Sequence, residues 1–247
     1  MRVISGTARG TKLKTLDVPH LRPMLDRVKT ALFNIIRARL PGTLALDAFS
    51  GSGALGIEAL SGGAAWCTFV ERDQRLARLL SENLAKCHLA DRAEVLNADF
   101  LSLSVRPQRL GAAPVDLVFV DPPYAMVEDP NDRARLFAAI EQAIGLWIAP
   151  GALVMLHHAP LPHALWPTER LECFDRRVYG RSQITLFDVR GEAGSPGGDR
   201  AEAELLPSGP MLLCDTALRH CSATLLCEAT QCGAESYAVR SSEQLAA

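Results

Sequence analysis

A strand-like apolar run that enters a glycine-rich turn constrains this chain most strongly. Residues 44–49 (Leu-Ala-Leu-Asp-Ala-Phe) lead into a turn at residues 51–56 (Gly-Ser-Gly-Ala-Leu-Gly), and a helix-forming segment, Ala54 to Leu60, leaves it. Because glycine has no Cβ, Gly51 and Gly53 can adopt positive φ and let the backbone approach a ligand closely. The helix that follows presents unpaired N–H groups at its positive end. The pattern therefore predicts a turn that binds a nucleotide-like cofactor.

Glu71 supports this interpretation from further along the chain. It stands twenty residues beyond Gly51, at the end of another apolar run, Phe69-Val70. An acidic residue at this spacing is placed to accept hydrogen bonds from ribose hydroxyls. A tight turn without a ligand would explain the glycines but not the acid.

Strand-like and helix-like segments alternate from Thr43 onward, which favours right-handed βαβ units on a mostly parallel sheet. The expected strands are residues 44–47, 67–71, 93–97, 115–120, 151–156, 171–178 and 183–189, and the expected helices are residues 26–40, 54–60, 74–87 and 132–144. Asp26 is expected to cap the first helix. The last two strands, joined around Gly180, leave no room for a crossover helix, so they should form an antiparallel edge hairpin. We therefore expect an α/β, Rossmann-like, seven-stranded sheet with helices on both faces and ligands at the carboxyl ends of its strands.

The 247 residues, 48% of them hydrophobic, suffice for one full domain and leave a remainder. We expect a basic amino-terminal arm and helix at residues 1–42, the main domain at residues 43–190, and a linker with a disordered tail at residues 191–247. The tail begins with a linker-like composition, Gly-Glu-Ala-Gly-Ser-Pro-Gly-Gly, and shows no sustained periodicity afterwards.

Charge is distributed unevenly, although the net charge is only -2. Residues 1–45 carry nine Lys or Arg against two acidic residues, whereas residues 191–247 carry three basic and eight acidic residues. A basic amino-terminal region on an otherwise acidic protein is typical of a polyanion binder, although a solvated basic face would look the same. The candidate nucleic-acid contacts are Arg2, Arg9, Lys12, Lys14, Arg22 and Arg27.

The sequence predicts neither a membrane span nor a signal peptide, because its apolar runs are too short. We therefore expect a cytoplasmic protein whose seven cysteines are reduced. Four of them, Cys214, Cys221, Cys227 and Cys232, cluster without the spacing of a zinc site, and we expect no metal. The six histidines are dispersed, and the sequence assigns none of them a role.

The run Asp121-Pro122-Pro123-Tyr124 is the second strong signal, and it directly follows the strand-like run at residues 115–120, in which five of the six residues are apolar. The two prolines fix φ and remove two N–H donors, which leaves backbone carbonyls free to face a ligand. Asp121 adds a carboxylate acceptor and Tyr124 a flat ring. Acceptors beside a stacking face suit a planar base that bears an NH₂ group, although a rigid turn would use the same residues.

The chain resembles the class I S-adenosylmethionine-dependent methyltransferases and, more narrowly, the RsmD-type 16S ribosomal RNA guanine-N2 methyltransferases. The matching stretches are Arg2 to Gly6 with Arg9-Gly10, Leu21-Arg22-Pro23, Asp26-Arg27-Val28, Leu32-Phe33-Asn34, Leu46 to Leu60, Val70 to Asp73, Asp121 to Tyr124, and Tyr179-Gly180 with the closing strand. The resemblance covers residues 2–189. The chain departs from the family pattern at Met24, at Thr30 and at His157-His158, where an acid is usual after the fifth strand.

The resemblance implies S-adenosylmethionine as cofactor. The glycine turn would hold its methionine portion above Asp47, Glu71 would take the ribose hydroxyls, and Asp99-Phe100 would border the adenine. The implied cofactor residues are Asp47, Phe49, Gly51, Ser52, Gly53, Glu71, Arg72, Asp99 and Phe100. The implied catalytic residues are Asp121, Pro122, Pro123 and Tyr124, which would receive a guanine flipped out of its helix. The implied partner is 16S ribosomal RNA within a small-subunit particle, bound by a monomer.

Several other functions share part of this pattern. An adenine-N6 methyltransferase acting on DNA or RNA would use the same acceptors and is the closest alternative. A nicotinamide dehydrogenase shares the glycine turn but leaves Asp121 to Tyr124 unexplained, and a purely RNA-binding module leaves both motifs without a purpose. A cytosine-C5 methyltransferase needs a nucleophilic cysteine near residues 121–124, and a serine hydrolase needs a different elbow around Ser52.

Overall fold

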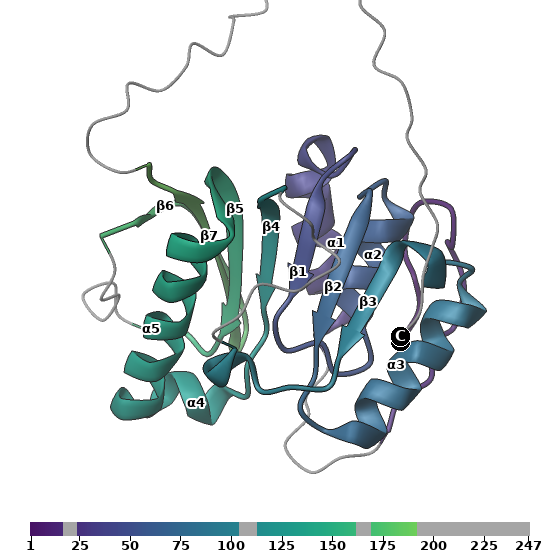
Figure 1. Cartoon of the computed structure of the whole chain (residues 1–247), viewed down its shortest axis with the longest axis horizontal. Helices are drawn as coiled ribbons and strands as arrows, with labels where there is room; N and C mark the ends of the chain where they lie inside the picture. The colour runs from purple at the N-terminus through teal and green to yellow at the C-terminus, as the bar shows by residue number, and fades with distance from the viewer. Residues whose placement is uncertain (17–23, 104–112, 162–168, 192–247) are drawn as a thin grey trace, which may run out of the picture. The chain divides into compact units, whose positions relative to one another are not determined.

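One seven-stranded sheet organises the computed structural model of the protein, which describes residues 1–16, 24–103, 113–161 and 169–191 (Figure 1). The strands are β1 (Leu44–Asp47), β2 (Trp66–Val70), β3 (Ala93–Leu96), β4 (Val115–Val120), β5 (Ile148–His158), β6 (Leu171–Tyr179) and β7 (Ser182–Val189). Their order is β3-β2-β1-β4-β5-β7-β6; the first five are parallel, and β7 is antiparallel to both β5 and β6. The expected mostly parallel sheet with an antiparallel edge hairpin is confirmed.

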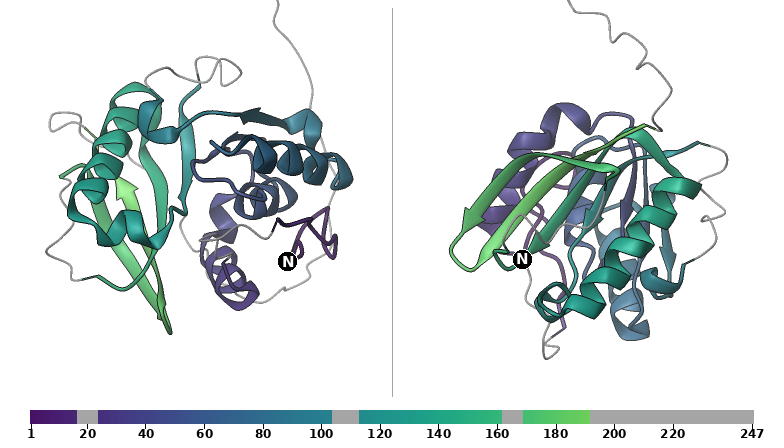
Figure 2. Two further views of the ribbon diagram at one scale, coloured as in Figure 1. Left: turned by 90° about the horizontal axis from the view of Figure 1, so that it is seen from below. Right: turned by 90° about the vertical axis from the view of Figure 1, so that its left-hand side faces the viewer.

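Helices cover both faces of the sheet, as Figure 2 shows. The helices are α1 (Asp26–Ile36), α2 (Ala54–Ser61), α3 (Gln74–Lys86), α4 (Tyr124–Glu128) and α5 (Pro130–Leu146). Apolar side chains of α1, α2 and α3 pack in one buried cluster against alternate strand residues such as Phe119 and Met155. Those of α4 and α5 pack in a second cluster against the residues between them, such as Val118 and Val154. This alternation follows from the two-residue period of a strand.

The register of β1 and β4 places the two sequence motifs side by side. Asp47, the last residue of β1, pairs with Phe119, two residues before Asp121. From β1 the chain crosses over to β2, whereas from β4 it crosses to β5 on the other side. A crevice opens where the direction of crossover reverses, at the carboxyl ends of the strands. The topology therefore brings the glycine turn and the Asp121–Tyr124 corner to one edge of the sheet.

Two helices on either side of this crevice begin with aspartate caps. Asp73 accepts the Arg75 N–H at 2.8 Å at the start of α3. Asp129 accepts two backbone N–H groups at the start of α5, at 2.8 and 2.9 Å, and Pro130 follows it directly. Each cap satisfies donors that have no partner inside the helix.

Several expected boundaries shift in the structure. The first helix begins at Asp26 itself. Asp26 therefore lies in the first turn, and Leu25 is the cap residue in its place. That helix ends at Ile36 and continues as a 3-10 turn, Arg37–Arg39. β5 starts at Ile148, because Ile148 already pairs with Val115 before an irregularity around Gly151, and it runs on through both histidines. The short helix α4 was not expected.

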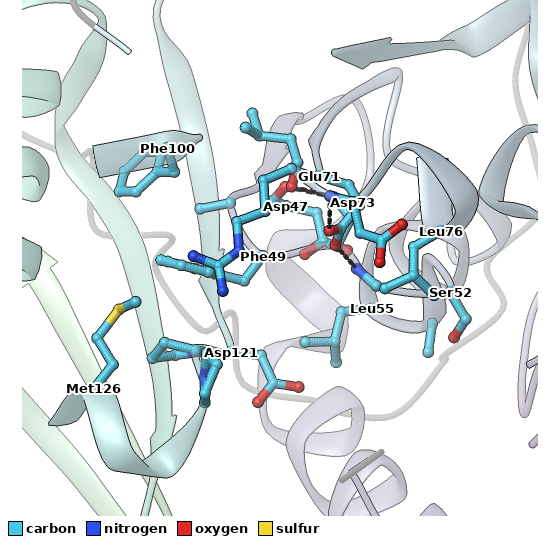
Figure 3. Close-up of a pocket in the computed structure, with 18 of the residues that line it drawn as sticks. Asp47, Phe49, Ser52, Leu55, Glu71, Asp73, Leu76, Phe100, Asp121 and Met126 are labelled. Atoms are coloured by element: carbon cyan, nitrogen blue, oxygen red, sulfur yellow. Dashed lines mark hydrogen bonds between the residues drawn. The ribbon is translucent and has the colours of Figure 1, made fainter. Parts of the chain in front are cut away.

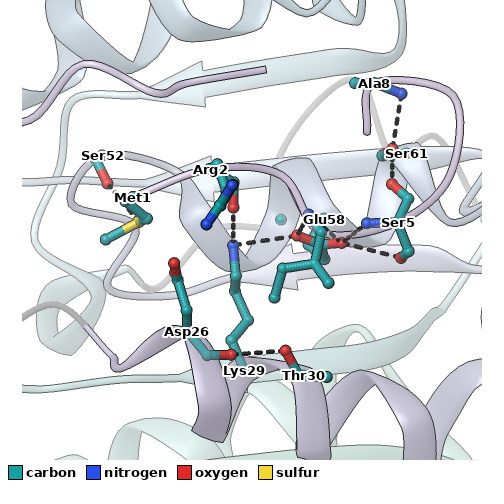
Figure 4. Close-up of polar contacts among 12 residues, drawn as sticks. Met1, Arg2, Ser5, Ala8, Asp26, Lys29, Thr30, Ser52, Glu58 and Ser61 are labelled. Carbon is teal, nitrogen blue, oxygen red and sulfur yellow. Dashed lines mark hydrogen bonds and ion pairs between the residues drawn. The ribbon is translucent and has the colours of Figure 1, made fainter. Parts of the chain in front are cut away.

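The first sixteen residues fold back instead of extending away as an arm. Arg2 and Lys12 form an antiparallel bridge, and Val3, Ala8 and Leu13 are buried. Figure 4 shows how the segment is fixed to α2: the Glu58 carboxylate accepts the N–H groups of Ile4 and Ser5 at 2.7 to 3.0 Å.

Beneath this contact, Lys29 of α1 forms a buried ion pair with Glu58 at 3.1 Å, and its ammonium donates to the Arg2 carbonyl at 2.7 Å. The Ser61 hydroxyl also joins the segment to α2, by donating to the Ser5 carbonyl and accepting the Ala8 N–H. Because α2 begins at the glycine turn, the amino-terminal segment and α1 brace that turn from behind.

Some expectations concern residues outside the described part of the chain. Arg22 is one of them, and so are the four clustered cysteines and residues 192–247 of the expected linker and tail. The division of residues 1–190 at residue 42 stays a prediction, and all described residues fall within one unit, Met1–Gly198. Among the described residues, no helix is both long and apolar enough to cross a membrane.

Candidate active site

A cavity of about 660 Å³ lies at the carboxyl ends of β1, β2 and β4. Figure 3 shows Asp121 and Met126 toward one end of it and Glu71, Asp73 and Ser52 toward the other. The predicted site residues that line it are Asp47, Phe49, Gly51, Ser52, Glu71, Arg72, Asp99, Phe100, Asp121, Pro122, Pro123 and Tyr124. A single cavity thus joins the two motifs that the sequence singles out.

Gly53 and Gly56 shape the turn without lining the cavity. Gly53 is the cap residue of α2 and has φ of +83°, and a Cβ there would lie 2.1 Å from the Leu80 side chain. A Cβ on Gly56 would lie 2.3 Å from the Phe69 ring, so only glycine lets α2 pack this closely on β2. The predicted cofactor residue Gly53 therefore acts on the cavity through the backbone path that it permits.

The carboxylate of Glu71 fixes the shape of the turn across the crevice. Its Oε2 accepts the Gly51 N–H and its Oε1 accepts the Asp73 N–H, both at 2.8 Å. The Asn97 side chain holds the same strand end by donating to the carbonyls of Glu71 and Arg72 at 2.8 and 3.0 Å. Each carboxylate oxygen keeps a further lone pair, so Glu71 can still accept ribose hydroxyls.

Asp47 lies beneath the glycine turn and is fully buried. Its Oδ2 accepts the Gly56 N–H at 3.0 Å, while its Oδ1 has no hydrogen-bond partner among the described residues. Burial raises the pKa of Asp47 to about 7, the Gly56 N–H opposes this shift, and the nearby charges of Asp121 and Glu71 add to it. An orphaned acceptor in such a place suits a cationic or hydrogen-bond-donating ligand.

Two aromatic rings stand at another wall of the cavity. Phe49 and Phe100 meet edge to face, with ring centroids 5.7 Å apart. Asp99 precedes Phe100 and accepts the Leu101 N–H at 3.0 Å, which fixes the turn that carries both residues. Apolar ring faces beside a carboxylate suit an adenine, whose ring is planar and whose amino group donates.

The Asp121–Tyr124 corner leads directly into α4. Pro123 is the cap residue of α4, and its carbonyl accepts the Met126 N–H at 2.9 Å. Arg133 of α5 donates to the carbonyl of Val127 at 2.9 Å and to that of Glu128 at 3.3 Å. These bonds hold the carboxyl end of the short helix, so the corner is fixed at both ends.

His157, to which the sequence assigns no role, touches both polar side chains of the corner. It is 2% exposed, its Nδ1 lies 2.7 Å from Asp121 Oδ1, and its Nε2 lies 3.1 Å from the Tyr124 hydroxyl. That hydroxyl also lies 2.7 Å from Ser182 Oγ at the start of β7. The only sequence signal for this contact is that His157 interrupts the family pattern at the end of the strand that pairs with β4.

Sequence reasoning also missed Met1, Met24 and Arg181, all of which line the cavity. Met1 arrives through the folded-back amino-terminal segment, and Arg181 lies in the turn between β6 and β7. The candidate RNA contacts that the structure describes are exposed and lie outside the lining; they are Arg2, Arg9, Lys12, Lys14 and Arg27.

The charged and polar groups that line the cavity fit the cofactor that the family resemblance implies. Asp47, Glu71, Asp99 and Asp121 all line it, so a ligand with net positive charge would offset their mutual repulsion. The amino end of α2 faces the same space and favours a carboxylate. A sulfonium, an ammonium, a carboxylate and a ribose would each find a complementary group here.

Known proteins are similar to this chain over most of its length. The family model described as conserved hypothetical protein 95 matches residues 1–188. The ribosomal RNA small subunit methyltransferase D of Escherichia coli K12 is 37% identical over 78% of this chain and 93% of its own. The putative rRNA methyltransferase YlbH of Bacillus subtilis is 39% identical over 77% and 100%. Among solved structures, a putative methyltransferase, YhhF from Escherichia coli, superposes with a TM-score of 0.64 at 30% identity and covers 78% of this chain and 99% of that one.

Proposed function

The chain belongs to the RsmD-type family of S-adenosylmethionine-dependent ribosomal RNA methyltransferases, and from that premise we propose that it methylates the exocyclic N2 of a guanine in 16S ribosomal RNA. The observation that carries the proposal is the single cavity that joins the glycine turn to the Asp121–Tyr124 corner. Such a cavity can hold a methyl donor at one end and a purine amino group at the other.

The acceptors at the corner suit the chemistry of a guanine amine. Its lone pair is delocalised into the ring, so the amine is a poor nucleophile. Hydrogen bonds from the NH₂ to the Asp121 carboxylate and the Pro122 carbonyl would favour a pyramidal nitrogen whose lone pair is available. Positioning then supplies most of the catalysis, because bound S-adenosylmethionine supplies an already activated methyl group.

The residues of the other wall would hold the cofactor. In the proposal, Glu71 accepts the ribose hydroxyls, Phe49 and Phe100 border the adenine with Asp99, and Asp47 lies below the methionine portion. Gly51 and Ser52 line this part of the cavity, and Arg72 stands at its exposed edge.

The same corner would receive a base flipped out of its helix, since a paired guanine cannot present its amine to a methyl donor. Tyr124 offers a ring whose hydroxyl is fixed by His157 and Ser182, so its orientation is set before the base arrives. We place the reaction on a small-subunit particle in the cytoplasm, where ribosomal RNA is assembled. We also propose a monomer, because residues of one chain suffice to line the cavity.

The proposal is tested by identifying the methylated nucleoside. Small-subunit particles from a strain that lacks the protein, incubated with purified protein and S-adenosylmethionine, should yield N2-methylguanosine on digestion and mass spectrometry. Protein-free 16S RNA in parallel distinguishes the particle from the bare RNA as substrate. N6-methyladenosine as the product would overturn the proposal in favour of the adenine alternative.

A second substrate isolates the amine itself. Inosine differs from guanosine only by lacking the 2-amino group, so reconstituted particles carrying inosine at the mapped position should accept no methyl group there. The matched guanosine particle is the control. Methylation of the inosine particle at that position would contradict transfer to N2.

A further inference from the structure

We propose that His157 is a positioning residue for methyl transfer, which holds the Asp121 carboxylate in one orientation and, when it becomes protonated, weakens that carboxylate as an acceptor for the substrate amine. This inference rests on the proposed function, in which Asp121 accepts the substrate amine. It depends on a chain of three hydrogen bonds that runs from Asp121 through His157 and Tyr124 to Ser182.

Only one arrangement of protons satisfies all three bonds when the imidazole is neutral. An ionised Asp121 can only accept, so Nδ1 of His157 must carry the proton across their 2.7 Å contact. Nε2 then lacks a proton and accepts the Tyr124 hydroxyl at 3.1 Å. The Tyr124 oxygen in turn accepts the Ser182 hydroxyl at 2.7 Å. The other tautomer would set two lone pairs against each other at Asp121.

This chain commits Asp121 Oδ1 to His157, so the carboxylate offers its other oxygen to the substrate. The Asp121 side chain is 21% exposed whereas that of His157 is 2% exposed, so His157 contacts Asp121 from the protein interior. Second-sphere hydrogen bonds of this kind fix the orientation of a functional group within the small tolerance that catalysis needs. His157 thereby acts on the reaction through Asp121 and not by touching the substrate.

Protonation of His157 would change the arrangement at both ends. A proton on Nε2 turns it into a donor, so the Tyr124 hydroxyl must turn away and donate to Ser182. At the other ring nitrogen, the imidazolium forms a charge-assisted hydrogen bond with Asp121. This bond withdraws negative charge from the Asp121 carboxylate, which then accepts less strongly from the amine. We therefore expect kcat to fall on the acid side as His157 gains a proton.

Other titratable groups near His157 must be separated from it. They are Asp121 after β4, Tyr124 on α4 and His158 on its own strand, while Asp47 of β1 acts on Asp121 and Arg176 of β6 acts on His158. Burial lowers the pKa of His158 to about 4, so His158 stays neutral through the neutral range. Saturating cofactor removes the contribution that Asp47 makes through cofactor binding.

The test compares two substitutions with a matched control. His157→Asn keeps a donor near the Nδ1 position but does not titrate, so it should retain most of the activity and lose the acid limb of kcat. His157→Phe removes the donor and should lower kcat by about tenfold or more, with S-adenosylhomocysteine affinity unchanged. His158→Asn, on the neighbouring buried residue that contacts Thr185, should keep the acid limb. An acid limb that persists in His157→Asn would refute the inference.

A measurement on the unmodified protein keeps the inference testable if the variants fold poorly. Nitrogen-15 NMR of the neutral form of the His157 imidazole should show the Nδ1–H tautomer, and the Nε2–H tautomer would overturn the proposal. The identity of the methylated nucleoside tests the proposed function separately. Either conclusion can therefore fail while the other stands.

Discussion

Oε2 of Glu71 accepts the backbone N–H of Gly51 at 2.8 Å, which joins two motifs that lie twenty residues apart in the sequence. The acid proposed to bind ribose and the turn proposed to bind the methionine portion therefore form one hydrogen-bonded unit. Because Oε1 also holds the Asp73 N–H, the orientation of the carboxylate is set before any ligand binds. Preorganisation of this kind reduces the entropic cost of binding.

Replacing Glu71 should weaken cofactor binding in two steps. Glu71→Gln keeps one acceptor for the Gly51 N–H but loses the charge and one ribose acceptor. Glu71→Ala loses the charge and both carboxylate oxygens. We expect the Kd for S-adenosylhomocysteine to rise about tenfold in the first and about a hundredfold in the second, or about 1.4 and 2.7 kcal/mol. Calorimetric titration measures both, and Glu82→Gln, on the exposed face of α3, should leave the Kd unchanged. Equal Kd values for all four proteins would remove Glu71 from the cofactor site.

Asp121→Ala should lower turnover and spare the cofactor. The substitution removes the carboxylate proposed to accept the amine, so kcat should fall by at least about tenfold, or about 1.4 kcal/mol of barrier. S-adenosylhomocysteine should still bind, because the substitution leaves the proposed cofactor contacts of Glu71, Phe49 and Phe100 in place. Asp132→Asn, in an exposed pair with Arg135, is the control and should turn over normally. Unchanged turnover in Asp121→Ala would exclude its catalytic role.

Asp47 should make stability depend on pH in an unusual direction. In the folded protein its pKa is raised to about 7, whereas in the unfolded chain the proton leaves near pH 4. Between these values the folded state binds more protons, so this group makes the free energy of unfolding fall as pH rises from about 4 to about 7. Denaturant titrations at pH 5 and pH 7 should show this loss in the natural protein and a smaller one in Asp47→Asn. Identical losses in both proteins would show that Asp47 is not the group responsible.

The main chain explains why so much of the site follows from the sequence. A glycine turn after one strand and Asp121 after another must meet when the two strands are parallel neighbours, whatever the side chains between them do. Glu71 is predictable for the same reason, because it also ends a strand. The order of the strands and the single cavity at their carboxyl ends confirm this inference.

The residues that sequence reasoning missed are placed by side-chain packing. His157 reads as one of six dispersed histidines, and only the pairing of β5 with β4 brings it to Asp121. Lys29 and Glu58 read as ordinary charges on two helices, yet both are buried. Their role depends on how the amino-terminal segment folds back, and charge counting cannot reveal this. The same folding brings Met1 into the cavity, where a basic arm was expected.

Breaking the buried ion pair should destabilise the protein more than breaking an exposed one of similar length. Lys29 and Glu58 are 1% and 0% exposed, so Lys29→Met leaves a carboxylate without its counter-charge and should cost about 3–5 kcal/mol. Lys14 and Glu82 are each 58% exposed, and Lys14→Met should cost less than about 1 kcal/mol. Urea unfolding measures both. The double substitution Lys29→Met with Glu58→Gln should cost less than the sum of its parts, and strict additivity would argue against a coupled pair.

Arg181 should contribute a phosphate contact next to the catalytic corner. It is exposed, it lines the cavity, and it immediately precedes Ser182, whose hydroxyl contacts that of Tyr124. RNA that delivers a flipped base to the corner must pass this turn, so Arg181→Ala should weaken RNA binding and reduce its log–log salt slope by about one. Arg190→Ala is the matched control, because Arg190 lies just past the opposite end of β7 and pairs with Glu172. Fluorescence anisotropy across a salt series measures the slopes of both variants. The same series measures the salt slope of a variant in which Arg2, Arg9, Lys12 and Lys14 are neutralised. If Arg181→Ala and Arg190→Ala have the same slope as the natural protein, the RNA backbone does not follow the β6–β7 turn.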